Sequence, residues 1–101
     1  MKSPKDFFEK EVLEMSIKAY VMIEAQASWA DEVIAQISGL PNVKSADPVT
    51  GPYDGIAEIE VPDLDTLGTL VGEMNSIQGI TRTMTCIRMK FPRSAPKIEK
   101  G

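Results

Sequence analysis

The alternation of hydrophobic and polar residues along the chain predicts four β-strands. In residues 17–25, Ala19, Val21 and Ile23 fall on one face of an extended chain. The other face is also largely apolar, which is typical of a central strand that is covered on both sides. Pro48 places the second strand at a sheet edge or a bulge, because proline cannot donate a ladder hydrogen bond. The three further predicted strands span residues 43–50, 56–61 and 80–89.

Hydrophobic residues at helical spacing predict a helix over residues 28–39. Ser28 is expected to cap its N-terminus, and Gly39 is expected to take the left-handed conformation at its end. Pro41 then prevents the helix from continuing.

A second helix is predicted over residues 64–76, capped by Asp63 or Asp65. Gly68 and Gly72 weaken this helix by roughly 1 kcal/mol each relative to alanine. We expect a close approach between this helix and the sheet to be the reason for these glycines.

The order strand, helix, strand, strand, helix, strand predicts an α+β, ferredoxin-like βαββαβ fold. Its four-stranded antiparallel sheet would carry both helices on one face. Tyr20, Met22 and Ile56 would then lie on the other face, exposed in a monomer. Apolar patches of this kind mark subunit interfaces, so we expect at least a dimer.

Two further segments are predicted outside this unit. A further helix is predicted over residues 3–16, which can dock on the body or a neighbouring subunit, or fray as an amphipathic tail. Prolines and charges after Lys90 predict a flexible basic tail. The expected domains are residues 1–17, an N-terminal helical extension, 18–90, the folded unit, and 91–101, the tail.

The charge distribution argues against a nucleic-acid-binding body. The formal net charge is −4, divided between −9 in residues 1–81 and +5 in residues 82–101. The basic end can contact an anionic partner or simply be solvated. No run approaches the ~20 apolar residues of a membrane helix, and no apolar stretch follows Lys2 and Lys5 as in a secretory signal. We therefore expect a soluble, cytoplasmic protein.

The chemistry of the side chains offers little for catalysis, a cofactor or a metal. The chain has no histidine, the commonest general base and metal ligand. Its single cysteine, Cys86, excludes an intramolecular disulfide and lies in an apolar-rich run, so we expect it to be buried. We expect no catalytic residue, no cofactor and no metal site.

The turn predicted over residues 49–55, VTGPYDG, is the strongest candidate for a site. Gly51 and Gly55 permit positive φ at both ends of the tip, which would leave backbone N–H groups pointing outward. Such amides suit a ligand carboxylate and Asp54 suits an ammonium, so the turn can hold a small zwitterion. The same residues also make an ordinary hairpin turn that binds nothing.

Four stretches of the chain together resemble the ligand-binding domain of the Lrp/AsnC family, also called the RAM domain. The resemblance covers about residues 18–90, and its most specific part is the turn paired with the threonine-rich last strand. The stretches are residues 20–23 (YVMI), 40–43 (LPNV), 49–54 (VTGPYD) and 79–85 (GITRTMT).

The resemblance implies a ferredoxin-like domain that dimerises through its sheets, with dimers assembling into a ring of four. It also implies that an effector amino acid binds between dimers at the turn, here Gly51, Tyr53 and Asp54. Thr83 and Thr85 of the last strand are the expected partner residues from another subunit. Full-length members carry a winged helix-turn-helix before this domain. Residues 1–17 are too few for one, so the chain resembles the stand-alone form and is not expected to bind operator DNA by itself.

Three functions are open at this point. The first is an effector-sensing oligomeric module, which can act through full-length Lrp-like regulators. The second is a ligand-independent adaptor that oligomerises with DNA-binding paralogues. The third is a small ferredoxin-like enzyme, for which the sequence offers two acid pairs and three further polar side chains. These are Glu58 and Glu60, Asp63 and Asp65, and Tyr20, Tyr53 and Cys86.

Overall fold

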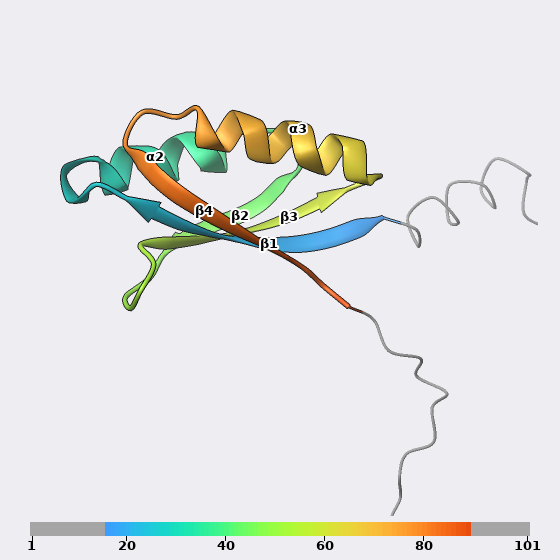
Figure 1. The fold of residues 1–101 in the computed structure, drawn as a ribbon, viewed down its shortest axis with the longest axis horizontal. Coiled ribbons are helices and arrows are strands. Elements are labelled where there is room, and N and C mark those ends of the chain that lie inside the picture. Colours follow the sequence, from blue (N-terminus) through green and yellow to red (C-terminus); the bar gives the residue numbers. More distant parts are fainter. Residues whose placement is uncertain (1–15, 90–101) are drawn as a thin grey trace, which may run out of the picture.

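The described part of the chain has two layers, an antiparallel sheet of four strands and two α-helices that cover one face of it (Figure 1). The structure is a computed structural model and describes residues 16–89. The strand order is β2-β3-β1-β4, which confirms the ferredoxin-like prediction. The elements are β1, Ile17–Ala25; a 3-10 turn η1, Ala27–Trp29; α2, Ala30–Ser38; β2, Val43–Pro48; β3, Gly55–Val61; α3, Leu64–Asn75; and β4, Ile80–Ile87.

The hydrophobic core lies between the helices and the sheet. On β1, Ala19, Val21 and Ile23 are fully buried, as the alternation predicts. The antiparallel register places Ala57 opposite Val21 and Ile59 opposite Ala19, so their side chains share the helix-facing side. The helices close the core with Val33, Ile37, Leu67, Leu70 and Met74. The opposite face of the sheet, here called the open face, is covered by no helix of residues 16–89 (Figure 1).

The edge strands also follow the prediction in position, although not in length. β2 is an edge strand and ends at Pro48, two residues earlier than expected. β4 is the other edge and ends at Ile87 rather than at residue 89. The predicted N-terminal helix and the basic tail fall on residues 1–15 and 90–101, outside the described residues, and stay predictions.

The first helix begins later than predicted, because the chain enters it through the 3-10 turn η1. Ser28 is therefore not its cap; Trp29 holds the N-cap position and makes no side-chain capping bond. A Cβ on Gly79 would overlap the Trp29 side chain, and Gly79 has φ +102°. The close packing of the indole on this glycine fixes the entry to the helix, and no local sequence signal encodes it.

The conformation of the glycine at the end of α2 and the surroundings of the two glycines within α3 also differ from expectation. Gly39 is right-handed with φ −90°, and the left-handed residue is Asn42 with φ 72°, a conformation asparagine tolerates. Gly68 and Gly72 do not mark a close approach to the sheet, because a Cβ on either would meet nothing within 4 Å. Both lie exposed on α3.

Cys86 is exposed rather than buried. Thr83 and Thr85 lie opposite the buried Ile23 and Val21, so these threonines take the helix-facing positions of β4. Cys86, of the opposite parity, lies across from Tyr20 on the open face. Its apolar neighbours indicated burial, but only one face of β4 has a core to enter.

Asp63, rather than Asp65, caps α3. Its Oδ1 accepts a hydrogen bond from the backbone N–H of Thr66 at 2.7 Å. Hydrogen bonds from the side chain and the backbone of Thr66 lower the pKa of Asp63 below its ordinary 3.8. The ionised cap also interacts favourably with the helix dipole.

The glycine geometry predicts opposite effects for two matched substitutions. Gly79→Ala should lower the free energy of unfolding by about 2 kcal/mol or more, since alanine would be strained at positive φ and would overlap Trp29. Gly72→Ala should raise it by up to about 1 kcal/mol, because the new methyl group meets only solvent. Urea denaturation measures both; equal effects of the two substitutions would contradict this assignment.

The cap of α3 predicts a pH-dependent effect. Asp63→Ala should destabilise the protein at pH 7 more than the control Asp65→Ala, because only Asp63 bonds the helix N-terminus. The folded-state pKa is depressed, so this stabilisation is present above 3.8 and is lost as pH falls through the folded pKa. The difference in urea midpoint between wild type and Asp63→Ala should therefore become smaller in acid. A difference that stays constant would show that the carboxylate charge is irrelevant.

Candidate functional site

The turn between β2 and β3 hangs below the sheet, on the side away from the helices (Figure 1). Gly51 has φ +119° and open space around it, so it is required for its conformation alone. Gly55 does not have positive φ, contrary to expectation. It is the buried first residue of β3, where a Cβ would collide with the Ile34 side chain and approach the Asp47 carbonyl oxygen to 3.3 Å.

Asp54 makes three hydrogen bonds, two of which fasten this turn to the end of β1. Its backbone N–H donates to the Ile23 carbonyl at 2.8 Å, and its carbonyl accepts from the Val49 N–H at 3.1 Å. Its carboxylate oxygen Oδ2 accepts from the Ala25 N–H at 2.8 Å. Asp54 therefore has a structural role, while Oδ1 has no hydrogen-bond donor among residues 16–89.

Tyr53 lies across the open face at β4. Its hydroxyl donates to the Sδ of Met84 at 3.5 Å, a weak hydrogen bond. The Arg82 guanidinium carbon lies 5.9 Å from the ring centroid, within cation–π range. The Arg82 Nε also lies 3.3 Å from the Oε1 of Glu24. The Tyr53 hydroxyl, the Met84 thioether and the Arg82–Glu24 ion pair therefore lie close together where the turn approaches β4.

The two threonines expected at the site lie on the other side of the sheet. Thr83 and Thr85 face the helix layer, and the Thr83 hydroxyl donates to the Asn75 Oδ1 at 3.0 Å. Tyr53 contacts Met84, which lies on the same strand but on the open face of the sheet. One subunit therefore brings Tyr53 and Asp54 together and does not bring the threonines to them.

Sequence reasoning missed Arg82 and Met84 as neighbours of Tyr53. The alternation of β4 already placed these two side chains on one face. What the sequence could not show is that the turn folds under the sheet, because the Asp54 bonds to β1 join segments far apart in the chain.

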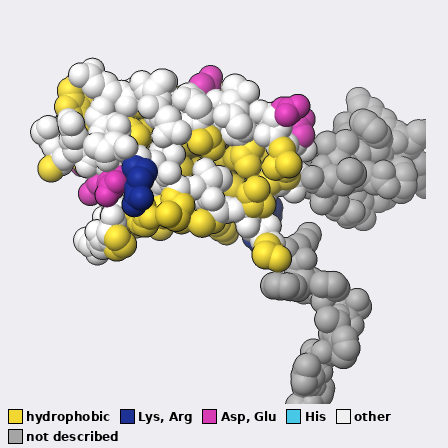
Figure 2. Space-filling view, viewed as in Figure 1, with side chains coloured by type: hydrophobic (Ala, Val, Ile, Leu, Met, Phe, Trp, Pro, Cys, Tyr) yellow, Lys and Arg dark blue, Asp and Glu magenta, His cyan; other side chains and the backbone are white. Residues whose placement is uncertain are grey.

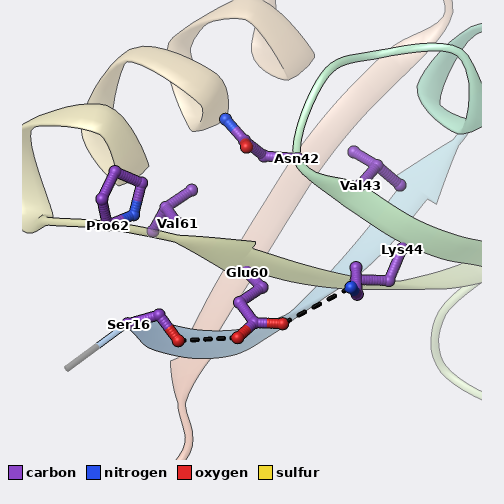
Figure 3. Close-up of a pocket in the computed structure, with 7 residues that line it drawn as sticks. All are labelled: Ser16, Asn42, Val43, Lys44, Glu60, Val61 and Pro62. Atoms are coloured by element: carbon purple, nitrogen blue, oxygen red, sulfur yellow. Dashed lines mark hydrogen bonds and ion pairs between the residues drawn. The ribbon is translucent and has the colours of Figure 1, made fainter. Parts of the chain in front are cut away.

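A second polar feature is an open depression of about 400 Å³ near the start of β1 (Figure 3). Glu60 accepts a 2.6 Å hydrogen bond from the Ser16 hydroxyl and lies 3.5 Å from the Lys44 Nζ. The Ser16 hydrogen bond, followed by the charges of Lys18 and Lys44, lowers the pKa of Glu60 below 4.5. The lining residues are Ser16, Asn42, Val43, Lys44, Glu60, Val61 and Pro62.

The lowered pKa of Glu60 indicates a structural rather than a catalytic role for this depression. A general acid acting near neutral pH needs a raised carboxyl pKa, whereas that of Glu60 is lowered. Within residues 16–89, no group of three or more histidine, cysteine or acidic side chains is placed to hold a metal ion. No helix in that range is long and apolar enough to cross a membrane.

Comparison with known proteins gives a family match and several similar proteins. The model of the Lrp/AsnC ligand binding domain matches residues 18–98. The HTH-type transcriptional regulator FL11 of Pyrococcus furiosus is 25% identical over 88 residues, which cover 87% of this chain and 58% of FL11. The chain thus spans somewhat more than half the length of this curated relative.

The chain is similar to many solved structures, of which two are described. TTHA0845 from Thermus thermophilus is 32% identical with a TM-score of 0.72, over 76% of this chain and 99% of that one. The transcriptional regulator NMB0573 from Neisseria meningitidis, solved as a complex with L-Met, is 22% identical with a TM-score of 0.69, over 89% of this chain and 56% of that one. The family match covers most of the chain and agrees with the observed sheet order, so the chain belongs to the Lrp/AsnC ligand-binding domain family.

Proposed function

We propose that this domain is an effector-sensing oligomeric module that binds an amino acid or a related small metabolite at the turn of residues 49–55. The site lies between neighbouring dimers, and its occupancy modulates transcription through partner regulators of the same family. The observation that carries the proposal is the turn itself, which Asp54 holds rigid while one of its carboxylate oxygens stays available.

The turn has both groups that a zwitterion requires. Among the described residues, the backbone N–H groups of Thr50, Gly51 and Tyr53 have no hydrogen-bond acceptor. These amides can donate to a ligand carboxylate, while the Oδ1 of Asp54 accepts from the ammonium. Because three hydrogen bonds already fix Asp54, little entropy is lost on binding.

A second subunit completes the site. Thr83 and Thr85 point to the helix-facing side of their own sheet, so they serve the turn of a neighbouring subunit rather than their own. A ligand held between dimers shifts the assembly by its differential affinity for the assembled state. The bound L-Met of NMB0573 supports an amino acid as the ligand class.

Dimers form through the open face in this proposal, and they assemble further into a ring of four dimers. Tyr20 and Met84 are 37% and 43% exposed on that face. Figure 2 shows hydrophobic side chains along the underside of the sheet as well as between α3 and the sheet. Exposed apolar side chains in the middle of a sheet are stabilised when a second sheet covers them.

A ligand-independent adaptor is the second candidate. The observation that favours it is that the Asp54 carboxylate and the Tyr53 hydroxyl both already have partners within the chain. In that case the turn is a rigid spacer between subunits, and the domain only oligomerises with itself or with DNA-binding paralogues.

Replacing the Asp54 carboxylate with an amide separates these two candidates. Asp54→Asn keeps an oxygen that accepts from Ala25 but removes the charge, so the fold should persist while amino-acid affinity falls roughly tenfold or more. Isothermal titration with each of the twenty standard amino acids measures the affinity. Light-scattering mass then measures whether the assembly is retained. Asp65→Asn on α3 is the matched control and should bind as wild type.

Two outcomes count against the sensor. Unchanged affinity in Asp54→Asn would refute the role of Asp54. A fixed mass and no heat with any of the twenty amino acids would favour the adaptor.

Mixing two inactive variants tests whether the turn and the threonines come from different subunits. Asp54→Asn and Thr85→Val should each bind weakly alone, because every site has one defect. Exchanging their subunits should restore part of the binding, since some sites then combine an intact turn with an intact threonine. Titration before and after exchange measures this, and the absence of any recovery would place both residues of a site in one subunit.

A further inference from the structure

The helix-facing side of the sheet is not fully covered by the described residues at the end where β1 begins. Ile87 lies opposite the fully buried Ala19, so it occupies a core-facing position of β4, yet it is 49% exposed. Leu64, the first residue of α3, is 61% exposed. Ile17 and Val71 are partly buried and pack against the core. The surface of these four residues, Ile17, Leu64, Val71 and Ile87, is here called the flank.

The flank lies at one end of the space between α3 and β4. The Thr83 hydroxyl donates to Asn75, which places the last turn of α3 beside the first half of β4. Leu64 lies about 16 Å from Asn75 along the helix, and Ile87 lies about 13 Å from Thr83 along the strand. Because α3 and β4 run in opposite directions from the short turn that joins them, both apolar side chains lie toward the start of β1. Figure 1 shows α3 and β4 diverging toward this end, and Figure 2 shows apolar side chains between them.

This exposed apolar surface is continuous with the core. Ile17 lies opposite the buried Val61, and Ile87 lies opposite Ala19, so the row of core-facing side chains extends into the flank. Scattered apolar residues are ordinary on a protein surface, but a patch that continues the core is stabilised when an apolar partner covers it. An apolar segment that covers the flank would therefore stabilise the fold.

The residues that precede β1 leave the sheet beside the flank. Ser16 directly precedes Ile17 of the flank. The Arg88 N–H donates to the Lys18 carbonyl at 2.8 Å, so the start of β1 and the end of β4 lie side by side. A segment that precedes Ser16 therefore needs no long connection to reach both Ile17 and Ile87.

The sequence of this segment has the pattern that such a partner needs. A helix is predicted over residues 3–16, nearly all of which lie outside the described part of the chain. Phe8, Val12 and Met15 follow the i, i+4, i+7 spacing, so they form one apolar stripe on that helix. The helix would be about 20 Å long, which is enough to span the flank. Helices of this length are marginal in water and are stabilised mainly by packing an apolar face.

Two other arrangements fit the same positions less well. The depression near the start of β1 also adjoins this segment, but its wall carries the ion pair of Lys44 and Glu60, which does not suit an apolar stripe. The residues after Met89 also begin near the flank. There, Pro92 and Pro96 exclude a helix that would align apolar side chains on one face.

We propose that residues 3–15 fold as an amphipathic helix and dock the stripe of Phe8, Val12 and Met15 onto the flank of the same chain. The docked helix completes the core at the start of β1. The inference goes beyond the proposed function, because the flank lies at the opposite end of β1 from the turn of residues 49–55 and on the other side of the sheet from the open face.

Disulfide trapping tests which face of the segment meets the flank and whether one chain supplies both. All variants carry Cys86→Ser, which removes the exposed native thiol. Val12→Cys with Leu64→Cys should cross-link within one chain under oxidised glutathione, because the stripe lies on the flank. Leu13→Cys with Leu64→Cys is the matched control, because Leu13 lies about 100° around the helix from Val12. Its cross-linking should be at least about tenfold slower, since a disulfide tolerates little misplacement.

Non-reducing electrophoresis and mass spectrometry of tryptic peptides separate cross-links within a chain from those between chains. Equal rates for the two pairs would show no preferred face and would overturn the inference. A covalent dimer would assign the stripe to another copy, and preferential trapping of Val12→Cys with Lys44→Cys would place it at the depression. Faster trapping of Phe91→Cys with Leu64→Cys would assign the flank to the residues after Met89. Each of these results would also overturn the proposed docking.

A stability measurement tests the same contact without an added disulfide. Val12→Asp should lower the urea midpoint by roughly 0.5 M or more, because it places a charge in the apolar contact. Leu13→Asp, on another face of the helix, should shift it by less than about 0.2 M. Leu64→Ser should lower the midpoint of the wild type but add little in the Val12→Asp variant, in which the contact is already lost. Additive effects of Val12→Asp and Leu64→Ser would contradict the docking.

Discussion

The candidate site depends on the bond between the Asp54 carboxylate and the backbone N–H of Ala25. Ala25 is the last residue of β1, at the point where the chain leaves the sheet for η1. The bond satisfies that backbone donor and holds the turn of residues 49–55 under the sheet. Tyr53 can then reach Met84 and Arg82. The backbone N–H groups of Thr50, Gly51 and Tyr53 have no acceptor among residues 16–89. Without this anchor the turn would be an ordinary mobile hairpin loop, and binding a ligand would first have to order it.

The side chains of β4 alternate between the two faces of the sheet, and this alternation divides the candidate site residues. Arg82 and Met84 lie below the sheet with the turn, while Thr83 and Thr85 lie above it with the helices. No rotation of a side chain brings both sets into one pocket of a single subunit. A site that uses both sets therefore requires a neighbour, which makes oligomerisation part of the binding chemistry.

The sequence was informative for several local features. Alternation predicted that β1 is central, Pro48 predicted that β2 is an edge or bulged strand, and two aspartates were predicted as alternative caps of α3. β1 is central, β2 is an edge, and one of the two aspartates, Asp63, is the cap. Several of the misses come from contacts between distant segments. The close packing of Trp29 on Gly79 accompanies the later start of α2, and the single-sided core leaves Cys86 exposed. The neighbours of Tyr53 were missed for the same reason, because the Asp54 anchor that positions the ring spans 29 residues.

Tyr53 connects the turn to the open face. Its backbone belongs to the turn, and its hydroxyl bonds Met84, which lies opposite Met22 in the apolar part of that face. A ligand that repositions the Tyr53 ring changes what Met84 presents to a second sheet, and a second sheet that packs on Met84 restrains the ring. By linkage, any such coupling is reciprocal, so dimerisation and ligand affinity would influence each other by the same free energy. The weak phenol–thioether contact suits this purpose, because it can be exchanged at little cost when either partner arrives.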